Sequence, residues 1–222
     1  MSSVPDLLAL LAGKAHVKRP PPPSAEGEFR LRVALDERVS PRPTAETHLQ
    51  MTTIGLVSDT HLPRFGRALP PALANGLLSA GVSRILHMGD LTDAIAIPLF
   101  EAIAPLDAVA GNNDPEDVWK RYGRRKIVTI DGVRIGMVHG DEGRGRNAHQ
   151  NATAAFDPIA VDIILYGHSH RPIVERRAGL TIANPGSPTD KRMMPTFSYA
   201  ILTIADGVPH IDLRYYDTRR PE

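Results

Sequence analysis

Side chains that can bind a divalent metal ion follow a short apolar segment at residues 54–57. Asp59 and His61 come directly after it and place a carboxylate and an imidazole two residues apart. In an extended chain, side chains at positions i and i+2 project to the same face, so this spacing predicts that both can reach one point. An oxygen and a nitrogen ligand that converge in this way would form half of a metal site. A strand followed by a turn that Asp59 caps explains the same pair, so the metal hypothesis depends on partners elsewhere.

Four further apolar segments end in turns that combine a glycine with metal-binding side chains. These side chains are Asp90, Asn112, His139, His168 and His170. Each turn has an ordinary explanation on its own, because glycine, aspartate and asparagine favour tight turns. The repeated coincidence of strand end, glycine and ligand residue favours a metal site, since α/β folds gather ligands at strand ends along one edge. The seven candidate ligands exceed the needs of one ion. They suit two ions about 3.5–4 Å apart that share a carboxylate.

The elements that would position these side chains alternate between strand and helix patterns from residue 51 onward. Helical patterns span about 68–80, 93–103, 115–122 and 147–156, and strand patterns precede each ligand-bearing turn. Asp131 and Gly132 predict a tight hairpin turn between strands at 126–130 and 133–138. Further strands are expected at 173–176, 180–183, 198–204 and 211–215. This order predicts one domain over residues 51–222, built from two packed sheets flanked by helices.

Residues 1–50 differ in composition from the rest of the chain. They contain four consecutive prolines at 20–23 and no sustained strand or helix period, which predicts a flexible N-terminal extension. An added edge strand at 29–35, where apolar and basic residues alternate, is an alternative. Translation that begins at Met51 is another.

The composition limits the classes of function. The 222-residue chain has no cysteine, which excludes disulfides, thiolate nucleophiles and cysteine-based metal sites. Its 26 basic and 25 acidic residues nearly cancel, so no basic field indicates nucleic acid as a specific partner. No segment approaches the roughly 18 apolar residues of a membrane span, and the N-terminus lacks the positive region of a secretory signal. We therefore expect a cytoplasmic protein without a membrane partner.

The order of the motifs resembles the signature of the calcineurin-like metallophosphoesterases. The matching motifs are Asp59-x-His61, Gly89-Asp90, Gly111-Asn112-x-Asp114, His139-Gly140 and Gly167-His168-x-His170. The Asn-Pro-Gly-Ser segment at 184–187 is similar to the compact bacterial and archaeal phosphodiesterase branch, which also includes the retromer subunit with this fold. The resemblance covers about residues 53–216. It implies an α/β fold, a four-layer αββα sandwich of two mixed sheets flanked by helices.

By this resemblance, two divalent metal ions bind between the motifs. Asp59, His61, Asp90 and His170 would bind one ion, and Asp90 (bridging), Asn112, His139 and His168 would bind the other. The implied reaction is phosphodiester hydrolysis by in-line attack of a hydroxide that bridges the ions. Mixed carboxylate, amide and imidazole ligands suit Mn²⁺ first, with Fe²⁺, Co²⁺, Ni²⁺ or Zn²⁺ as alternatives.

Asn113 departs from the family pattern, in which many members have a histidine that assists the leaving group. Asparagine can donate a hydrogen bond but not a proton near pH 7, and general-acid catalysis is worth about 10²–10⁴-fold. We therefore expect a small phosphodiester substrate and weak activity on alkyl phosphomonoesters. Asp114 would support the site without binding an ion. The side chains predicted to contact the substrate are Arg64, Asn184, Ser187, Lys191 and Arg192.

Two other functions fit the same fold. One is a protein-binding scaffold with a vestigial metal site, as the likeness to the retromer subunit allows. The other is a nuclease of the same superfamily, which the near-neutral charge and the lack of a basic or aromatic track disfavour. The complete ligand set favours the enzyme, and association into a homo-oligomer is compatible with all three functions.

Overall fold

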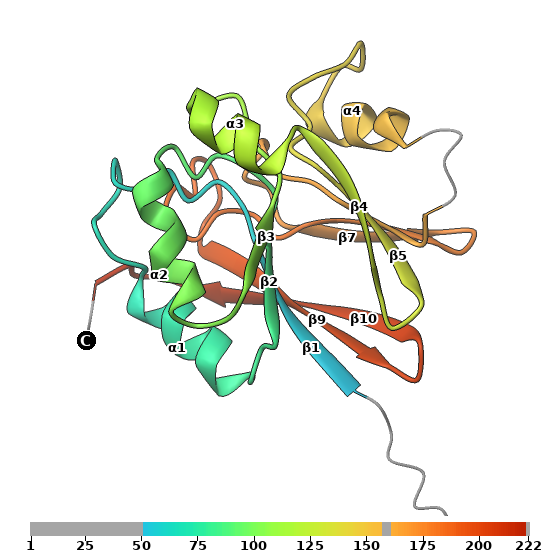
Figure 1. Ribbon diagram of the computed structural model, residues 1–222, viewed down its shortest axis with the longest axis horizontal. Helices are drawn as coiled ribbons and strands as arrows, with labels where there is room; N and C mark the ends of the chain where they lie inside the picture. Colours follow the sequence, from blue (N-terminus) through green and yellow to red (C-terminus); the bar gives the residue numbers. More distant parts are fainter. Residues whose placement is uncertain (1–50, 157–160, 221–222) are drawn as a thin grey trace, which may run out of the picture. The chain divides into compact units, whose positions relative to one another are not determined.

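The computed structural model describes residues 51–156 and 161–220, which form two five-stranded sheets with helices on their outer faces (Figure 1). The predicted extension at residues 1–50 lies outside the described residues, so the domain division at residue 50 stays a prediction. None of the helices in the described ranges has the length and hydropathy that a membrane crossing requires.

The first sheet has the strand order β10-β9-β1-β2-β3. Its strands are β1 (Met51–Val57), β2 (Arg84–His87), β3 (Leu106–Ala108), β9 (Phe197–Ala205) and β10 (Val208–Tyr216). Strand β2 pairs in parallel with both β1 and β3, whereas β9 pairs antiparallel with β1. The carboxyl ends of β1, β2 and β3 therefore lie at one edge of this sheet.

The second sheet has the strand order β4-β5-β6-β8-β7. Its strands are β4 (Arg125–Ile130), β5 (Val133–Val138), β6 (Ile163–Leu165), β7 (Ile173–Arg177) and β8 (Leu180–Asn184). Strands β5, β6 and β8 are parallel, and an antiparallel strand at each edge makes the sheet mixed. Asp131 and Gly132 join β4 to β5 with positive φ angles of 47° and 80°, as expected for the predicted hairpin turn.

Five helices flank the sheets in the described part of the chain. They are α1 (Pro71–Ser79), the 3₁₀ helix η1 (Ala94–Ala96), α2 (Ile97–Glu101), α3 (Glu116–Tyr122) and α4 (Ala148–Ala155). The structure divides the helix predicted at 93–103 into η1 and α2. Pro98 stands in the first turn of α2, and a proline is tolerated there but would break the interior of one continuous helix.

Three apolar cores separate four layers. One core packs helices α1 to α3 against the first sheet and contains Leu77 and Phe100. The second, with Leu56 and Leu165, lies between the two sheets. The third packs α4 against the second sheet and contains Phe156. The predicted four-layer αββα sandwich of two mixed sheets is confirmed.

Candidate metal centre

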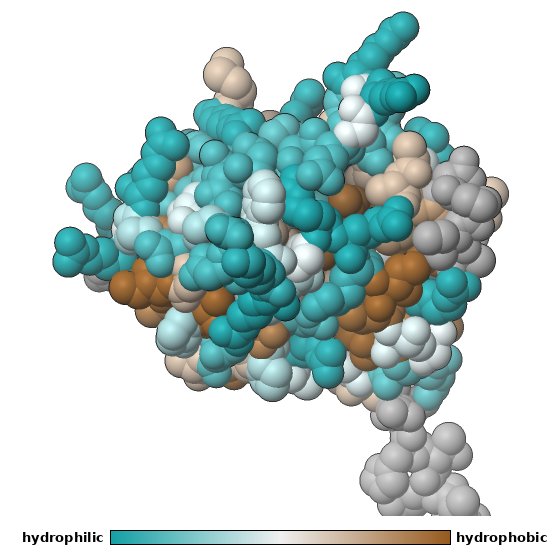
Figure 2. Space-filling view, turned by 45° about the horizontal axis from the view of Figure 1, so that its top comes forward, coloured by the Kyte–Doolittle hydropathy of each residue, from teal (hydrophilic) through white to brown (hydrophobic). Residues whose placement is uncertain are grey.

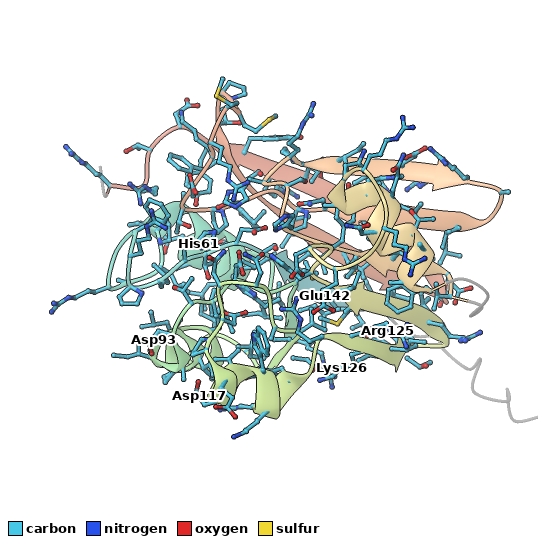
Figure 3. All side chains as sticks on the ribbon, turned by 90° about the horizontal axis from the view of Figure 1, so that it is seen from above. His61, Asp93, Asp117, Arg125, Lys126 and Glu142 are labelled. Atoms are coloured by element: carbon cyan, nitrogen blue, oxygen red, sulfur yellow. The ribbon has the colours of Figure 1, made fainter. Side chains whose placement is uncertain are left out.

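The predicted ligands follow five strands whose carboxyl ends the fold brings to one edge. Asp59 and His61 follow β1, Asp90 follows β2, Asn112 follows β3, His139 follows β5, and His168 and His170 follow β6. Seen from above, His61 lies among the inner loops, whereas Asp93 and Asp117 lie nearer the outside of the molecule (Figure 3). His61 is 4% exposed, and Asp59, Asp90 and His139 are fully buried.

The backbone at these turns is not extended, contrary to the geometry predicted for Asp59 and His61. Strand β1 ends at Val57, and five ligand residues have left-handed φ angles between 46° and 63°. They are Asp59, His61, Asp90, His168 and His170. The left-handed turns, rather than strand pleating, therefore direct the side chains toward one point. This conformation costs a non-glycine residue about 1–2 kcal/mol, and such strain concentrates at functional sites.

One cluster joins Asp59 to His61 and His170. The Nε2 atom of His170 lies 3.3 Å from Asp59 Oδ1 and 3.3 Å from His61 Nε2. The Nδ1 atom of His170 donates a hydrogen bond to Asp190 O at 2.5 Å, which orients the ring and leaves Nε2 as the ligand atom. Burial lowers the pKa of His61, so its ring is neutral and able to bind a metal ion. One carboxylate and two imidazoles thus converge on a buried point.

A second cluster joins Asp59 to Asp90 and His139. The Nε2 atom of His139 lies 3.3 Å from Asp90 Oδ2 and 3.9 Å from Asp59 Oδ1. Asp59 belongs to both clusters. The bridging role that the family resemblance implies for Asp90 stays a prediction. Asp90 also reaches the first cluster, because its Oδ2 lies 3.8 Å from His61 Nε2. Both carboxylates consequently lie between the two groups of imidazoles.

His168 lies beside the second cluster, and Asn112 lies in the turn after β3. The His168 ring meets the His139 ring at 76°, with centroids 5.1 Å apart, and His168 N donates a hydrogen bond to Asp59 Oδ2 at 3.0 Å. Asn112 is exposed in the turn that precedes Asn113, whose side-chain amide donates to Asp90 Oδ2 at 2.6 Å. The structure therefore brings five predicted ligands into two clusters and places His168 next to the second. Asn112 lies in the turn that also contains Asn113.

The donor atoms fit a divalent metal ion. His139 Nδ1 donates a hydrogen bond to Met88 O at 2.7 Å, while its Nε2 is buried without a hydrogen-bond partner among the described residues. Two buried carboxylates, of Asp59 and Asp90, face that nitrogen. Once Nε2 has given up its proton, a cation bound between them would accept the nitrogen lone pair and offset both negative charges, which are costly to bury.

Opposite charges buried together set the pKa values of this centre. Burial opposes charge on Asp59 and Asp90, but the neighbouring His170 and His139 hold the pKa of both carboxyl groups below the ordinary range. Burial likewise opposes charge on His139, whereas the carboxylates of Asp90 and Asp59 raise the pKa of His139 to about 9. Without a metal ion, His139 therefore carries the compensating positive charge at neutral pH.

Metal binding at pH 7 is expected to release about one proton from His139, because a ligand nitrogen must be deprotonated. The folded pKa of His139 lies above its ordinary value. Its charge therefore stabilises the metal-free protein fully below about pH 6.5, and this stability is lost as pH rises through about 9. Calorimetric titration with Zn²⁺ in two buffers of different ionisation enthalpy measures the released protons. The His139→Gln protein should release fewer protons. His210 is exposed on β10, so His210→Gln is the matched control. Equal release from all three proteins would contradict the assignment.

Asp114 supports the site from behind. Its carboxylate accepts hydrogen bonds from the backbone amides of Asp90, Thr92 and Gly111 at 2.6–2.8 Å, and burial raises its pKa. A Cβ atom on Gly111 would lie 2.1 Å from Asp90 Oδ1, so the close approach of these turns requires glycine. Asp114 is therefore a positioning residue that belongs to neither cluster.

The sequence analysis missed His87, at the end of β2. Gly89 N donates a hydrogen bond to its Nδ1 at 3.2 Å, so Nε2 carries the proton and donates to Thr60 Oγ1 at 3.1 Å. Burial lowers the pKa of His87 to about 3, so the ring is neutral. It links the two ligand-bearing turns after β1 and β2. The sequence signal for His87 is its polar side chain within the otherwise apolar segment at 85–88.

The structure corrects the role predicted for Asn184 and Ser187. Asn184 is fully buried, and its amide donates hydrogen bonds to Gly167 O at 2.8 Å and to Ser169 Oγ at 3.1 Å. Ser187 is 1% exposed, and its hydroxyl donates to Asp59 O at 2.7 Å. Because these polar atoms hold the ligand-bearing turns in place, the two residues are positioning residues and not substrate contacts.

The three basic side chains predicted to face the substrate lie on or near the surface. Arg64 is exposed, with its guanidinium 5.4 Å from the centroid of the Phe65 ring. Lys191 donates to a neighbouring backbone carbonyl. Arg192 Nη1 donates to His168 O at 3.3 Å and is thereby linked to the candidate metal centre. Substrate contact by these side chains stays a prediction.

Comparison with known proteins agrees with this geometry. A family model described as the calcineurin-like phosphoesterase superfamily domain matches residues 52–207. A probable metallophosphoesterase of Methanothermobacter thermautotrophicus is 31% identical over 144 residues, which cover 63% of this chain and 79% of that protein. A phosphodiesterase of Methanocaldococcus jannaschii is 28% identical over 148 residues, which cover 60% of this chain and 82% of that protein.

Solved structures share the fold. Vps29 of Entamoeba histolytica, crystallised with zinc, superimposes with a TM-score of 0.59 at 20% identity and covers 74% of this chain and 99% of its own. Identity this low supports the shared architecture alone.

Proposed function

Because this chain belongs to the calcineurin-like phosphoesterase superfamily, we propose that it is a phosphodiesterase that depends on two divalent metal ions. The observation that supports this most is the pair of buried clusters that share Asp59 and bring two carboxylates and three imidazoles together. The similarity to an archaeal phosphodiesterase supports the choice of a diester.

The residues present would divide between two ions. Asp59, His61 and His170 would hold one, and Asp90, Asn112, His139 and His168 the other, with a carboxylate shared between them. When bound, the ions would act as Lewis acids toward the phosphoryl oxygens and lower the pKa of a water molecule. Backbone carbonyls that accept from His139 Nδ1 and His170 Nδ1 fix which nitrogen of each ring faces the ions. We propose Mn²⁺ first, because mixed oxygen and nitrogen donors suit it, as they suit Fe²⁺, Co²⁺, Ni²⁺ and Zn²⁺.

Turnover after metal reconstitution tests this proposal. Metal-stripped protein should be inactive on bis(4-nitrophenyl) phosphate and should gain activity when Mn²⁺ or another of these ions is added. Elemental analysis should then find two ions per chain. A protein that binds no ion, or that binds two and hydrolyses no phosphodiester, would contradict the proposal.

The surface offers less support for the rival scaffold function. On the face that Figure 2 shows, hydrophilic residues interrupt the apolar areas. Among the described residues, large exposed apolar side chains come from separate elements, such as Ile95 in η1, Ile127 in β4 and Val208 in β10. Scattered apolar side chains are normal for a monomeric surface and do not by themselves mark a docking site.

Asn113 supports a preference for diesters over alkyl monoesters. Its exposed side chain donates to Asp90 Oδ2, and it can donate a hydrogen bond to a leaving group but no proton. We expect Asn113→His to raise kcat/KM for an alkyl phosphomonoester about 10–10²-fold relative to an aryl diester, since a general acid matters most for a poor leaving group.

Asn113→Gln is the matched control, because it keeps an amide and adds no titratable group. Steady-state assays of both variants on the two substrates measure the ratio. An unaltered protein that already prefers the monoester, or a ratio that Asn113→His leaves unchanged, would contradict the role given to Asn113.

A further inference from the structure

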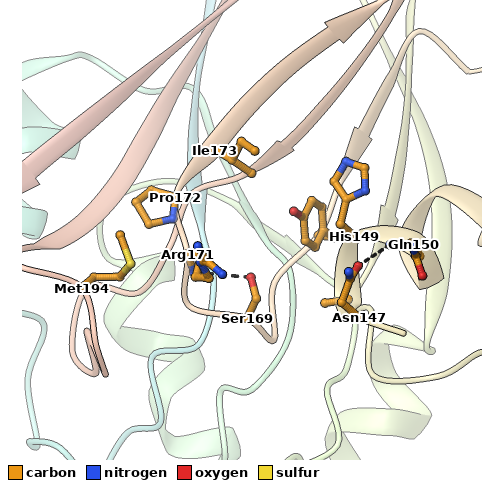
Figure 4. A pocket seen from close by; sticks show the side chains of 10 residues that line it. Asn147, His149, Gln150, Ser169, Arg171, Pro172, Ile173 and Met194 are labelled. Carbon is orange, nitrogen blue, oxygen red and sulfur yellow. Dashed lines mark hydrogen bonds between the residues drawn. The ribbon is translucent and has the colours of Figure 1, made fainter. Parts of the chain in front are cut away.

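A cavity of about 440 Å³ lies beside the turn that carries two candidate metal ligands (Figure 4). Ser169, which stands between His168 and His170, forms part of its wall. The first turn of α4 and the start of β7 form other walls. The volume falls within the range of about 300–1,000 Å³ that is typical of small-molecule sites. None of the seven candidate ligands lines the cavity, and the turn that contains Ser169 separates it from the metal centre.

The lining of the cavity suits a flat, largely apolar group. Figure 4 shows Pro172, Ile173 and Met194 on one side and His149 on the other. Ile173 is 39% exposed, although it stands at the start of a strand. Met194 has an adaptable thioether that packs well against aromatic rings. The His149 ring is held by Glu175, with Nε2 to Oε2 at 2.9 Å, so this wall is preformed.

A polar group without a partner lies among these apolar side chains. Tyr166 lines the cavity, is only 3% exposed and packs edge-on against His149, with ring centroids 5.8 Å apart. Its hydroxyl makes no hydrogen bond to any residue in the described ranges. The hydroxyl oxygen is not among the buried side-chain atoms that lack a hydrogen-bond partner, so it is accessible to a ligand or to water. The cavity is the space from which a ligand atom could supply one.

Positively charged side chains lie beside the cavity, and one of them also touches the backbone of a candidate metal ligand. A second cavity of about 390 Å³ shares Ser169, Arg171 and Met194 with the first and is also lined by Arg192. Arg192 Nη1 donates to His168 O at 3.3 Å. A phosphate at the metal centre with an attached group that extends over Ser169 would thus pass two guanidinium groups, which recognise phosphate oxygens.

We propose that the cavity lined by Tyr166, Ile173 and Met194 holds a planar aromatic ester group of the substrate, either a nucleoside or an aryl group. This inference rests on the proposed phosphodiesterase function and assigns its substrate class. The ring packs against Tyr166 and Met194. A nucleobase also supplies the polar atom that the Tyr166 hydroxyl lacks, which a plain aryl group does not.

Diesters with one common leaving group test the proposal. The metal-loaded protein is assayed on 4-nitrophenyl phosphate diesters whose second ester group is methyl, phenyl or thymidin-5′-yl. We expect kcat/KM to be at least about tenfold higher for the phenyl and thymidinyl diesters than for the methyl diester, as filling an apolar pocket typically gives. Ile173→Ala combined with Met194→Ala should reduce the ratio of kcat/KM for the phenyl diester to that for the methyl diester to about one.

Two further variants sharpen the test. Tyr166→Phe should lower kcat/KM about 3–10-fold for the thymidinyl diester alone, the effect of one lost hydrogen bond. Ile127→Ala is the matched control for Ile173, because Ile127 is 38% exposed on β4, the opposite edge strand of the same sheet. It should change none of the three rates.

A binding measurement does not depend on turnover. In zinc-loaded protein with ¹³C-labelled methionine methyl groups, thymidine 5′-monophosphate should shift the Met194 signal, which a Met194→Leu spectrum identifies. Inorganic phosphate should shift it less.

The outcomes separate the two proposals. Failure to hydrolyse any diester overturns the proposed function. Equal rates on all three diesters, an aromatic gain that survives the double substitution, or a Met194 signal that the nucleotide leaves unmoved overturns the cavity assignment alone.

Discussion

Asp90→Asn is expected to lower kcat/KM for bis(4-nitrophenyl) phosphate about 10³-fold. Asp90 Oδ2 lies 3.3 Å from His139 Nε2 and 3.8 Å from His61 Nε2, so its carboxylate can serve both ion positions. Metal ions contribute several kcal/mol of charge stabilisation to a phosphoryl-transfer transition state. Each 1.36 kcal/mol corresponds to about a tenfold change in rate. Asparagine preserves the shape of the side chain and removes its charge.

The Asp90→Asn substitution should also change two measurements other than turnover. Elemental analysis should find fewer than two ions per chain. The proton released on Zn²⁺ binding should also diminish, because Asp90 is a main cause of the raised pKa of His139. Asp93→Asn is the control. Asp93 is exposed three residues along the chain, and its Oδ1 accepts a hydrogen bond from Ile95 N at 2.9 Å, a cap that asparagine also provides. An Asp90→Asn protein that keeps two ions and more than about a tenth of the activity would refute this role.

Asp114→Ala is expected to lower the free energy of unfolding of the metal-free protein by about 4 kcal/mol. The substitution leaves the backbone amides of Asp90, Thr92 and Gly111 without their acceptor. Each unsatisfied buried donor costs about 1–3 kcal/mol. The turns after β2 and β3 lose their common anchor at the same time, so activity should fall even in the fraction that stays folded.

Urea unfolding at pH 7 measures this effect. Asp117→Ala is the matched control, because exposed Asp117 lies in the following helix α3 and accepts only from the adjacent Val118 N. It should cost less than about 1 kcal/mol, as surface substitutions usually do. A loss for Asp114→Ala as small as that of Asp117→Ala would show that the three amides find other partners.

The elements and the ligand positions are predictable from local patterns. Short apolar segments stop at glycine-containing turns, and the turns carry the ligand side chains, so each strand end and its ligand are visible within a few residues of sequence. The hairpin turn at Asp131 and Gly132 is predictable for the same reason, since its positive φ angles depend on residue type.

The supporting residues are not predictable in this way, because their contacts join distant parts of the chain. Ser187 Oγ bonds to Asp59 O across 128 positions, and His87 bonds to Thr60 across 27. Residue type alone leaves open whether an asparagine or a serine near a site faces the substrate or the backbone. The left-handed turns at the ligands were also missed, because aspartate and histidine carry no obligatory signal for positive φ.

Those left-handed turns have a consequence for how the chain can change under selection. Five candidate ligand residues keep a left-handed backbone conformation, which costs a non-glycine residue about 1–2 kcal/mol. Selection for stability alone would therefore disfavour aspartate and histidine in this backbone conformation. Selection for metal binding would keep them. A chain that has lost its need for metal is therefore expected to lose these residues early.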